Sequence, residues 1–256
     1  MERNACLIPV LLSFLLLLSC NRESKVTILG GGNVKVMELC GGDGLAIISA
    51  VQAVADEGRQ AVDDIKRPVI GEAAVPLEKY IPESPLMNFA ADALLEMASR
   101  HSSLPVDIAI TNKGGLRSNL QQGVITFGDI YNVFPFENTL AFLTLDGTQL
   151  VQLCHEVAAV GGEAVSGLEL VITSDGKLLV ATVRGEAIDP AKNYRIATSD
   201  YLSQGNDRMT TLALGVDKDI KSDITIRELM VQYVKELTLR GEKLRAVCDG
   251  RIMVKK

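Results

Sequence analysis

Histidine is scarce in this chain, with only two residues in 256. A two-metal phosphoesterase centre needs several His, Asp and Asn ligands that hold its ions about 4 Å apart. Neither His101 nor His155 belongs to an HExxH or DxH motif, and no GxSxG sequence offers a serine nucleophile. We therefore expect no metal site and no catalytic residue in this chain, and we interpret both histidines as surface or capping residues.

Clusters of basic residues and closely spaced cysteines are missing as well. The net charge is −6 and lysines and arginines do not gather in one stretch, which argues against nucleic-acid binding. Because no CxxC spacing occurs, the sequence does not support a zinc knuckle or a thioredoxin-like motif. Cys154 lies on the apolar stripe of a predicted helix and is expected to be buried. The sequence allows a Cys40–Cys248 disulfide in an oxidising envelope.

The N-terminus has the features of a targeting segment. A short charged start precedes an apolar run from Ala5 to Leu18, which Pro9 interrupts and which is shorter than the about 20 residues of a membrane-spanning helix. The run ends in LLSC, which resembles the lipobox of bacterial lipoproteins. We predict a signal peptide over residues 1–19, lipidation of Cys20 and anchoring in the bacterial cell envelope. The alternative is a cleaved secretory signal with an incidental cysteine.

The remaining chain divides into a leading segment and one larger domain. Residues 20–66 are interpreted as a glycine-rich tether followed by a helix over residues 45–65, because apolar residues recur there at helical spacing. From residue 67 to 256, strands and helices mix without regular β-α-β alternation, which predicts an α+β fold with mixed sheets and packed helices. The predicted helices start at residues 85, 148 and 226; Ser84-Pro85 marks the first start, and a capping box of Thr225 with Glu228 marks the last. The predicted strands cover 68–75, 106–111, 139–146, 167–173, 178–184, 194–198 and 249–254. Asp146-Gly147 is expected to form a turn, and the segment 174–177 predicts a hairpin between the strands on either side of it.

Two segments carry side chains suited to one ligand with an anionic end and a flat end. In TNKGGLR, Gly114 and Gly115 allow a tight turn or close approach to a ligand, and Arg117 offers a planar fork for phosphate or carboxylate. In FPFEN, a proline restricts the backbone before Phe136, and Asn138 follows. On these residues alone, a surface arginine and a core phenylalanine are an equally good interpretation.

A third segment, SDYLSQGNDR, adds an aromatic ring at Tyr201 and a carboxylate at Asp207. This carboxylate can accept hydrogen bonds from vicinal hydroxyls, although a half-buried tyrosine and a turn-forming aspartate would also fit. What favours a binding site is the set of side chains: one arginine, two rings, an amide and a carboxylate, all on loops at strand ends.

The motifs resemble, in order and spacing, the C-terminal domain of bacterial 5′-nucleotidases and UDP-sugar hydrolases. The resemblance covers roughly residues 67–256 and rests on ESPLMNFAADAL, TNKGGLR, GVITFGDIYNVFPFEN, LDGTQL, GLEL, VRGEAIDPAKNYRIATSDYLSQGND and DGRI. It implies a substrate-binding domain of that fold, with Phe136 and Tyr201 on either side of the base, Asn138 near the base, Arg117 at the phosphate and Asp207 at the ribose.

The chain also departs from the family pattern. The usual Gly-Gly-Asp-Gly is here Gly205-Asn206-Asp207-Arg208, where asparagine at the second position tolerates left-handed backbone better than most residues. Many members carry arginines upstream of the ESPLMN-like stretch, whereas this chain offers only Lys79. We expect no counterpart in this chain of the family's N-terminal metallophosphoesterase domain, whose two metals hydrolyse the substrate.

We therefore predict a binding domain for a nucleoside monophosphate, nucleoside or nucleotide sugar. It would need no cofactor of its own and would act in nucleotide catabolism with a separately encoded metallophosphoesterase that holds the divalent metals. The alternative is a non-catalytic envelope scaffold that kept the fold and lost nucleotide recognition. Direct hydrolysis by this chain is the third interpretation.

Overall fold

The computed structural model describes residues 44–255 and the side chains of residues 51–255. Its internal contacts divide the chain into residues 1–62 and 63–256. The helix α2 (Gly44–Lys66) confirms the helix predicted over 45–65. Among the described residues, no helix has the length and apolarity that a membrane crossing requires.

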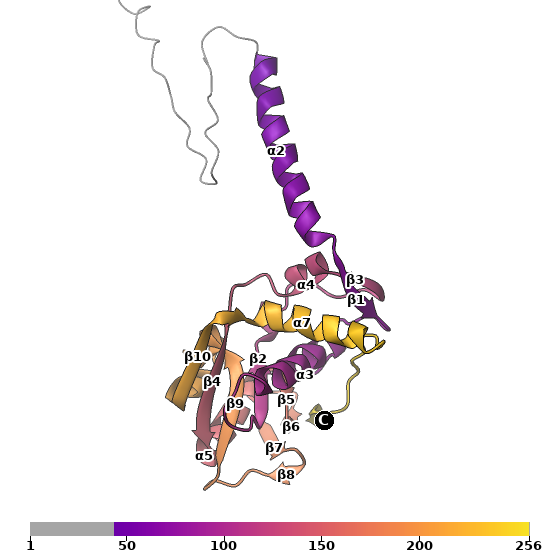
Figure 1. Cartoon of the computed structure of the whole chain (residues 1–256). Coiled ribbons are helices and arrows are strands. Elements are labelled where there is room, and N and C mark those ends of the chain that lie inside the picture. Colours follow the sequence, from indigo (N-terminus) through magenta and orange to yellow (C-terminus); the bar gives the residue numbers. More distant parts are fainter. Residues whose placement is uncertain (1–43, 256) are drawn as a thin grey trace, which may run out of the picture. The chain divides into compact units, whose positions relative to one another are not determined.

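The larger unit is built around a five-stranded mixed sheet (Figure 1). Strands β2 and β9 run parallel to each other, and the other neighbours are antiparallel. This sheet and the helices packed on it confirm the predicted α+β class. In spatial order the strands are β10 (Val216–Thr225), β4 (Thr139–Asp146), β9 (Asn193–Ser199), β2 (Ile108–Thr111) and β5 (Ala164–Ser166).

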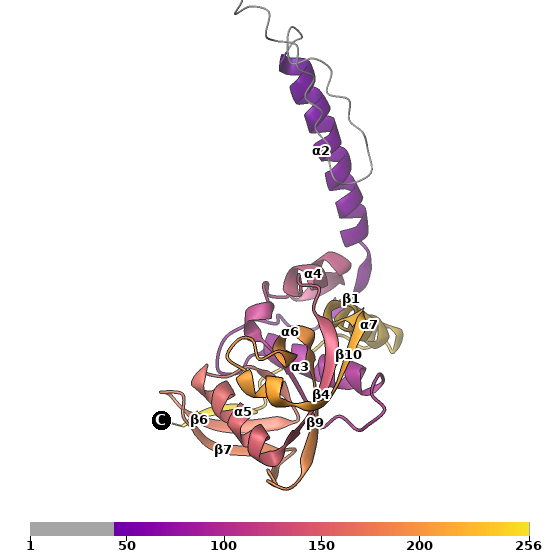
Figure 2. The same ribbon diagram turned by 90° about the vertical axis from the view of Figure 1, so that its left-hand side faces the viewer.

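Both faces of this sheet are covered. Helices α3 (Pro85–Ser99) and α7 (Ile226–Leu239) lie side by side and pack on one face (Figure 1), while α5 (Gly147–Ala159), labelled in Figure 2, packs on the other. Along β4, Phe142 belongs to the α3 and α7 cluster and its neighbour Leu143 to the α5 cluster. Residues 140–145 of β4 are all buried, and all of them except Thr144 are apolar, as expected for a strand that is covered on both faces.

Smaller elements complete the unit. A four-stranded sheet has the order β11 (Ile252–Lys255), β6 (Leu168–Thr173), β7 (Leu178–Val183) and β8 (Glu186–Ala187), and its β6–β7 pair confirms the predicted hairpin. Strands β1 (Val69–Ala73) and β3 (Gly123–Thr126) form an antiparallel pair. The remaining helices are α4 (Phe127–Val133), α6 (Asp200–Ser203) and the 3₁₀ helices η1 (Lys113–Gly115) and η2 (Thr210–Leu214).

Helix starts follow the capping chemistry of the sequence. The Ser84 hydroxyl accepts a hydrogen bond from the Met87 amide (3.3 Å), and Thr225 forms a capping box with Glu228, as predicted. Asp146-Gly147, which we predicted as a turn, instead caps and opens α5. A Cβ on Gly147 would lie 2.0 Å from the Asp189 carbonyl oxygen, so glycine is required there by a close backbone approach.

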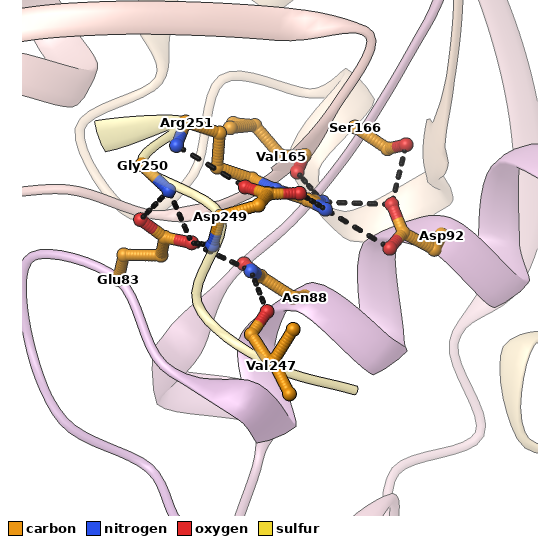
Figure 3. A network of polar contacts seen from close by, with 9 residues as sticks. All are labelled: Glu83, Asn88, Asp92, Val165, Ser166, Val247, Asp249, Gly250 and Arg251. Atoms are coloured by element: carbon orange, nitrogen blue, oxygen red, sulfur yellow. Dashed lines mark hydrogen bonds and ion pairs between the residues drawn. The ribbon is translucent and has the colours of Figure 1, made fainter. Parts of the chain in front are cut away.

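A polar network holds the C-terminal segment in place and joins two of the sequence motifs, ESPLMNFAADAL and DGRI (Figure 3). The buried Glu83 carboxylate accepts hydrogen bonds from the Asn88 side chain (2.7 Å) and the Asp249 amide (2.7 Å). Arg251 pairs with Asp92 (2.7 Å) and Asp249 (2.7 Å). Although burial of its guanidinium works in the other direction, these two carboxylates raise the pKa of Arg251. The network anchors β11 to the start of α3.

The described cysteines differ in their surroundings. Cys154 is fully buried, as predicted, and burial raises the pKa of its thiol to about 12. Cys248 is exposed, with its sulfur 3.4 Å from the Tyr80 hydroxyl. Cys20 and Cys40 lie outside the described residues, so their predicted lipidation and disulfide stay predictions.

Candidate functional site

Three loops converge at one end of the central sheet. Because β2 and β9 are adjacent and parallel, η1 and α6, which follow them, lie at the same end. Strand β4 is antiparallel to β9, so its first residues also lie there, with Leu140 opposite Ser199. The Asp200 carboxylate accepts a hydrogen bond from the Thr139 amide (2.9 Å) and ties two of these loops together.

Asp207 lies at the centre of this loop cluster. One carboxylate oxygen accepts a hydrogen bond from the Tyr201 hydroxyl (2.9 Å), and the other accepts one from the side-chain amide of Asn112 (2.6 Å). A Cβ on Gly114 would lie 3.4 Å from Asp207 Oδ2, so the glycine turn lies against the carboxylate. The hydrogen bond to Asp207 raises the pKa of the Tyr201 hydroxyl. The fold thus brings three of the predicted site residues together.

Phe136, Asn138 and Gly115 meet at a second point of the cluster, where they line a small cavity together with Asn112. The Phe136 side chain is 49 % exposed and the Tyr201 side chain 38 %, whereas the described phenylalanines at 89, 134 and 142 are buried. The core interpretation of Phe136 is therefore wrong. Asn112 connects the two points, because it both touches the cavity and binds Asp207.

Asn112 is a site residue that sequence reasoning missed. Asn112 is almost fully buried, and its side-chain amide donates a hydrogen bond to Asp207, 95 positions further along the chain. The signal was present in TNKGGLR, where a polar amide directly follows a buried strand and precedes two glycines.

Arg117 lies at the outer edge of the turn. Its backbone amide donates to the Val133 carbonyl (2.9 Å), which fixes the main chain, while the side chain is exposed and only its Nη1 approaches the Gly114 carbonyl, at 3.5 Å. Within the part of the chain that the structure describes, no acidic side chain lies at ion-pair distance from this guanidinium. Its charge is available to an anion from solution.

Residues 69–214 match the family model described as "5′-nucleotidase, C-terminal domain". This chain belongs to that family. Members of the 5′-nucleotidase C-terminal domain family bind nucleotide substrates.

Several known proteins share this domain. The chain is 28 % identical over 217 residues to the trifunctional nucleotide phosphoesterase protein YfkN of Bacillus subtilis, covering 77 % of this chain and 14 % of YfkN. It is 27 % identical to the cell wall protein Lmo0130 of Listeria monocytogenes, covering 80 % of this chain and 29 % of that protein. The structure of the Thermus thermophilus 5′-nucleotidase precursor matches with a TM-score of 0.68 and 27 % identity, over 82 % of this chain and 43 % of that one. This chain thus spans less than half of each of these proteins.

Lys79 lies just upstream of the ESPLMN stretch, and its ammonium group is already engaged. It donates to the backbone carbonyls of Lys113 (3.3 Å) and Leu116. The backbone amide of Lys79 also donates to the Asn119 side chain (3.0 Å). Lys79 therefore holds the glycine turn in place instead of offering a free charge beside Arg117.

The loop that replaces the family's Gly-Gly-Asp-Gly takes left-handed backbone at three positions. These are Gly205 (φ 86°), Asp207 (φ 54°) and Arg208 (φ 65°). Asn206, where we anticipated a left-handed residue, is not among them, and its side chain donates to the Tyr201 carbonyl instead (2.8 Å). The loop keeps its turn by straining Arg208, since a residue with a Cβ adopts this conformation at a cost.

Replacing Arg208 with glycine should relieve this strain. Left-handed backbone at a residue with a Cβ costs about 1–2 kcal/mol, which glycine avoids. Glycine also makes the unfolded chain more flexible, which offsets about 0.5–1 kcal/mol of this gain. We therefore expect the free energy of unfolding to rise by up to about 1 kcal/mol. Chemical denaturation measures the change. The control is Arg208→Ala, which removes the same side chain and keeps the strain; an equal gain in both variants would contradict the explanation.

The described residues contain no group of three or more His, Cys, Asp or Glu side chains placed to hold a metal ion. The predicted absence of metal from the whole chain stays a prediction.

Proposed function

We propose that this chain binds a nucleoside monophosphate or a related nucleoside in the loop cluster around Asp207. The observation that carries the proposal is the arrangement of Asp207, which two neutral donors hold between the exposed Tyr201 ring and the turn that bears Arg117. A carboxylate held in this way can accept both hydroxyls of a ribose, since each oxygen keeps a free lone pair.

The other site residues would recognise the remaining parts of the ligand. Phe136 and Tyr201 expose ring surface, and stacking of a base on an aromatic side chain contributes about 1–3 kcal/mol. Asn138, beside Phe136 in the cavity, would lie near the base edge. Arg117, with its exposed fork, would pair with the phosphate. The cluster thus offers a group for each part of a nucleotide: rings for the base, a carboxylate for the sugar and a guanidinium for the phosphate.

Hydrolysis would take place with a separately encoded metallophosphoesterase that supplies the divalent metals. The relatives support only the view that cleavage lies outside this domain, because the segment similar to this chain makes up 14 % of YfkN and 43 % of the Thermus protein. In this arrangement the chain would hold the nucleotide while a partner cleaves it. Mixing the chain with a candidate partner and measuring phosphate release from AMP tests this step.

We also propose that the protein is lipid-anchored through Cys20 in the bacterial cell envelope. The support is the LLSC sequence at the end of the apolar run, together with the likeness to a relative that is named a cell wall protein. Mass spectrometry of the N-terminal peptide from membrane fractions tests the modification, and a Cys20→Ser variant that stays in the membrane would contradict it.

Calorimetry with AMP and adenosine tests the binding proposal. We expect Arg117→Ala to weaken AMP binding by roughly tenfold or more, because a hydrogen-bonded charge pair contributes about 1.5–3 kcal/mol, and to leave adenosine binding nearly unchanged. Arg245→Ala is the matched control, since Arg245 is exposed and follows Leu244, whose backbone is hydrogen-bonded to Glu72 and Ala74 and not to the loop cluster. Wild-type protein that binds neither ligand would overturn the proposal.

The second candidate is an envelope scaffold that has lost nucleotide recognition. The observations that favour it are the strained Arg208 in the ribose loop and the engaged ammonium of Lys79. Alanine at Phe136 and Tyr201 separates the two functions: the scaffold would keep its partner binding and show no loss of nucleotide affinity.

A further inference from the structure

We infer that Lys113 and Glu163 form a positioning pair that holds the glycine turn against Asp207, and that the pair makes nucleoside binding sensitive to pH. The inference rests on the proposed binding function, which assigns the turn and Asp207 to the ligand. Neither residue would touch the ligand; both would act through the turn.

Lys113 fastens the turn to the end of helix α5. Its ammonium group donates to the carbonyls of Val160 (2.9 Å) and Gly162 (2.7 Å), which lie just beyond the helix. A cation at the C-terminal end of a helix is favoured by the partial negative charge there. The same ammonium pairs with the Glu163 carboxylate (3.0 Å), whose other oxygen accepts the backbone N–H of Lys113. Side chain and main chain of Lys113 are thus both held.

Lys79 holds the opposite side of the turn through the carbonyls of Lys113 and Leu116. The Glu163 carboxylate accepts the backbone N–H of Lys113, and the Lys79 ammonium donates to carbonyls of the turn. Together they fix the orientation of the peptide groups in the turn. The neighbours of Lys113 are the residues that meet Asp207: Asn112 donates to its carboxylate, and Gly114 lies against it. A shift of the turn would change both contacts.

Glu163 is the titratable half of the pair. Its side chain is only 5 % exposed, and this burial raises the pKa of its carboxyl, although the bonds from Lys113 work in the other direction. The charged groups that face it are Lys113 from η1 and Asp207 from the loop between α6 and η2, and the charge of Asp207 raises the pKa further. As the pH falls through this raised pKa, Glu163 takes up a proton and its ion pair with Lys113 is lost.

The upward shift in the pKa of Glu163 predicts opposite pH dependences for protein stability and for ligand affinity. Since the pKa is raised on folding, the folded chain holds this proton more readily than the unfolded chain does. The contribution of Glu163 to stability is therefore present at acid pH and lost as the pH rises through the raised pKa. Ligand affinity should change in the opposite direction, because the ionised pair is the form that holds the turn.

Titration calorimetry with adenosine across a pH series tests the inference, because adenosine has no group that titrates near neutral pH. We expect wild-type affinity to fall as the pH drops through the Glu163 transition. Glu163→Gln should be about tenfold weaker at neutral pH, a change of about 1.4 kcal/mol, and should lose this pH dependence. Glu186→Gln is the matched control, since Glu186 is an exposed glutamate on β8. Wild-type affinity and pH dependence in Glu163→Gln would overturn the inference.

A measurement without ligand keeps the test independent of the proposed function. In the ¹⁵N-labelled full chain, the amide signals of Gly114 and Gly115 should titrate together, with a midpoint above that of an ordinary glutamate, and should not do so in Glu163→Gln. If wild-type protein binds no nucleoside, the proposed function fails, while this titration still decides the role of the pair. Amides that do not respond in folded wild-type protein would overturn the inference, even if the variant failed to fold.

Discussion

Replacing Arg251 with methionine is expected to lower the free energy of unfolding by about 2–3 kcal/mol. Only 13 % of the Arg251 side chain is exposed. Its guanidinium donates to Asp92 (2.7 and 3.0 Å), to Asp249 (3.0 and 2.7 Å) and to the Val165 carbonyl (2.9 Å), as Figure 3 shows. Methionine keeps much of the apolar stem and leaves the carboxylates of Asp92 and Asp249 without their shared cation. Because both carboxylates are about half exposed, we place the loss below that of a fully buried pair.

Chemical denaturation measures this change, and two further variants define its cause. Arg251→Lys keeps the charge and loses the two-pronged geometry, so it should recover only part of the stability. Arg245→Met, at an exposed arginine in the same C-terminal segment, should change stability by less than about 0.5 kcal/mol. A loss in Arg251→Met no larger than in Arg245→Met would show that the network of Figure 3 does not stabilise the fold.

The stability that Arg251 contributes should depend on pH. The hydrogen bond from Arg251 lowers the pKa of Asp249 below its usual range. An acid whose pKa is lowered by folding contributes stability above its unfolded pKa and loses it as the pH falls through the lowered value. The stability difference between wild type and Arg251→Met should therefore shrink in strongly acidic solution, below the ordinary aspartate pKa of about 3.9.

Replacing Asp207 with asparagine is expected to weaken adenosine binding by about a hundredfold, equivalent to about 2–3 kcal/mol. The change turns one acceptor oxygen into an NH₂ donor. That donor would face either the Asn112 amide or the Tyr201 hydroxyl, both of which donate to Asp207 in the present structure. The ribose would lose its charged acceptor, and the Tyr201 ring would lose its anchor.

Calorimetry with adenosine and 2′-deoxyadenosine makes this test specific to the ribose. Wild-type protein should prefer adenosine, and Asp207→Asn should bind the two nucleosides almost equally. Asp217→Asn is a close control, because Asp217 is also an exposed aspartate with left-handed backbone (φ 50°) and asparagine tolerates that conformation well. An unchanged preference for adenosine in Asp207→Asn would rule out this carboxylate as the ribose acceptor.

Local features of the fold could be predicted because they depend on neighbouring residues. The Ser84-Pro85 start, the Thr225–Glu228 box and the turn at 174–177 each place their partners within four positions. Strand β10 was missed, since it lies at the edge of the sheet and reads VDKDIKSDIT, with a charge at nearly every second position and little apolar pattern. An edge strand is recognised by its pairing with β4, which lies about 80 positions earlier.

The candidate site divides in the same way. By itself, the sequence determined the types of side chain, the loops that carry them and the family, because these are properties of short motifs. The tertiary structure decided what those side chains contact. It made Asn112 and Tyr201 the donors to Asp207, left Phe136 and Arg117 exposed, and placed Lys79 and the Lys113–Glu163 pair around the turn.

Apart from the Tyr201–Asp207 hydrogen bond, which spans 6 positions, these contacts join residues 34 to 95 positions apart. They exist because β2 and β9 lie side by side and parallel, with β4 antiparallel beside β9, so that three distant loops open at one end of one sheet. Strand order and direction arise from the packing of the whole core, and no single motif in the sequence contains them.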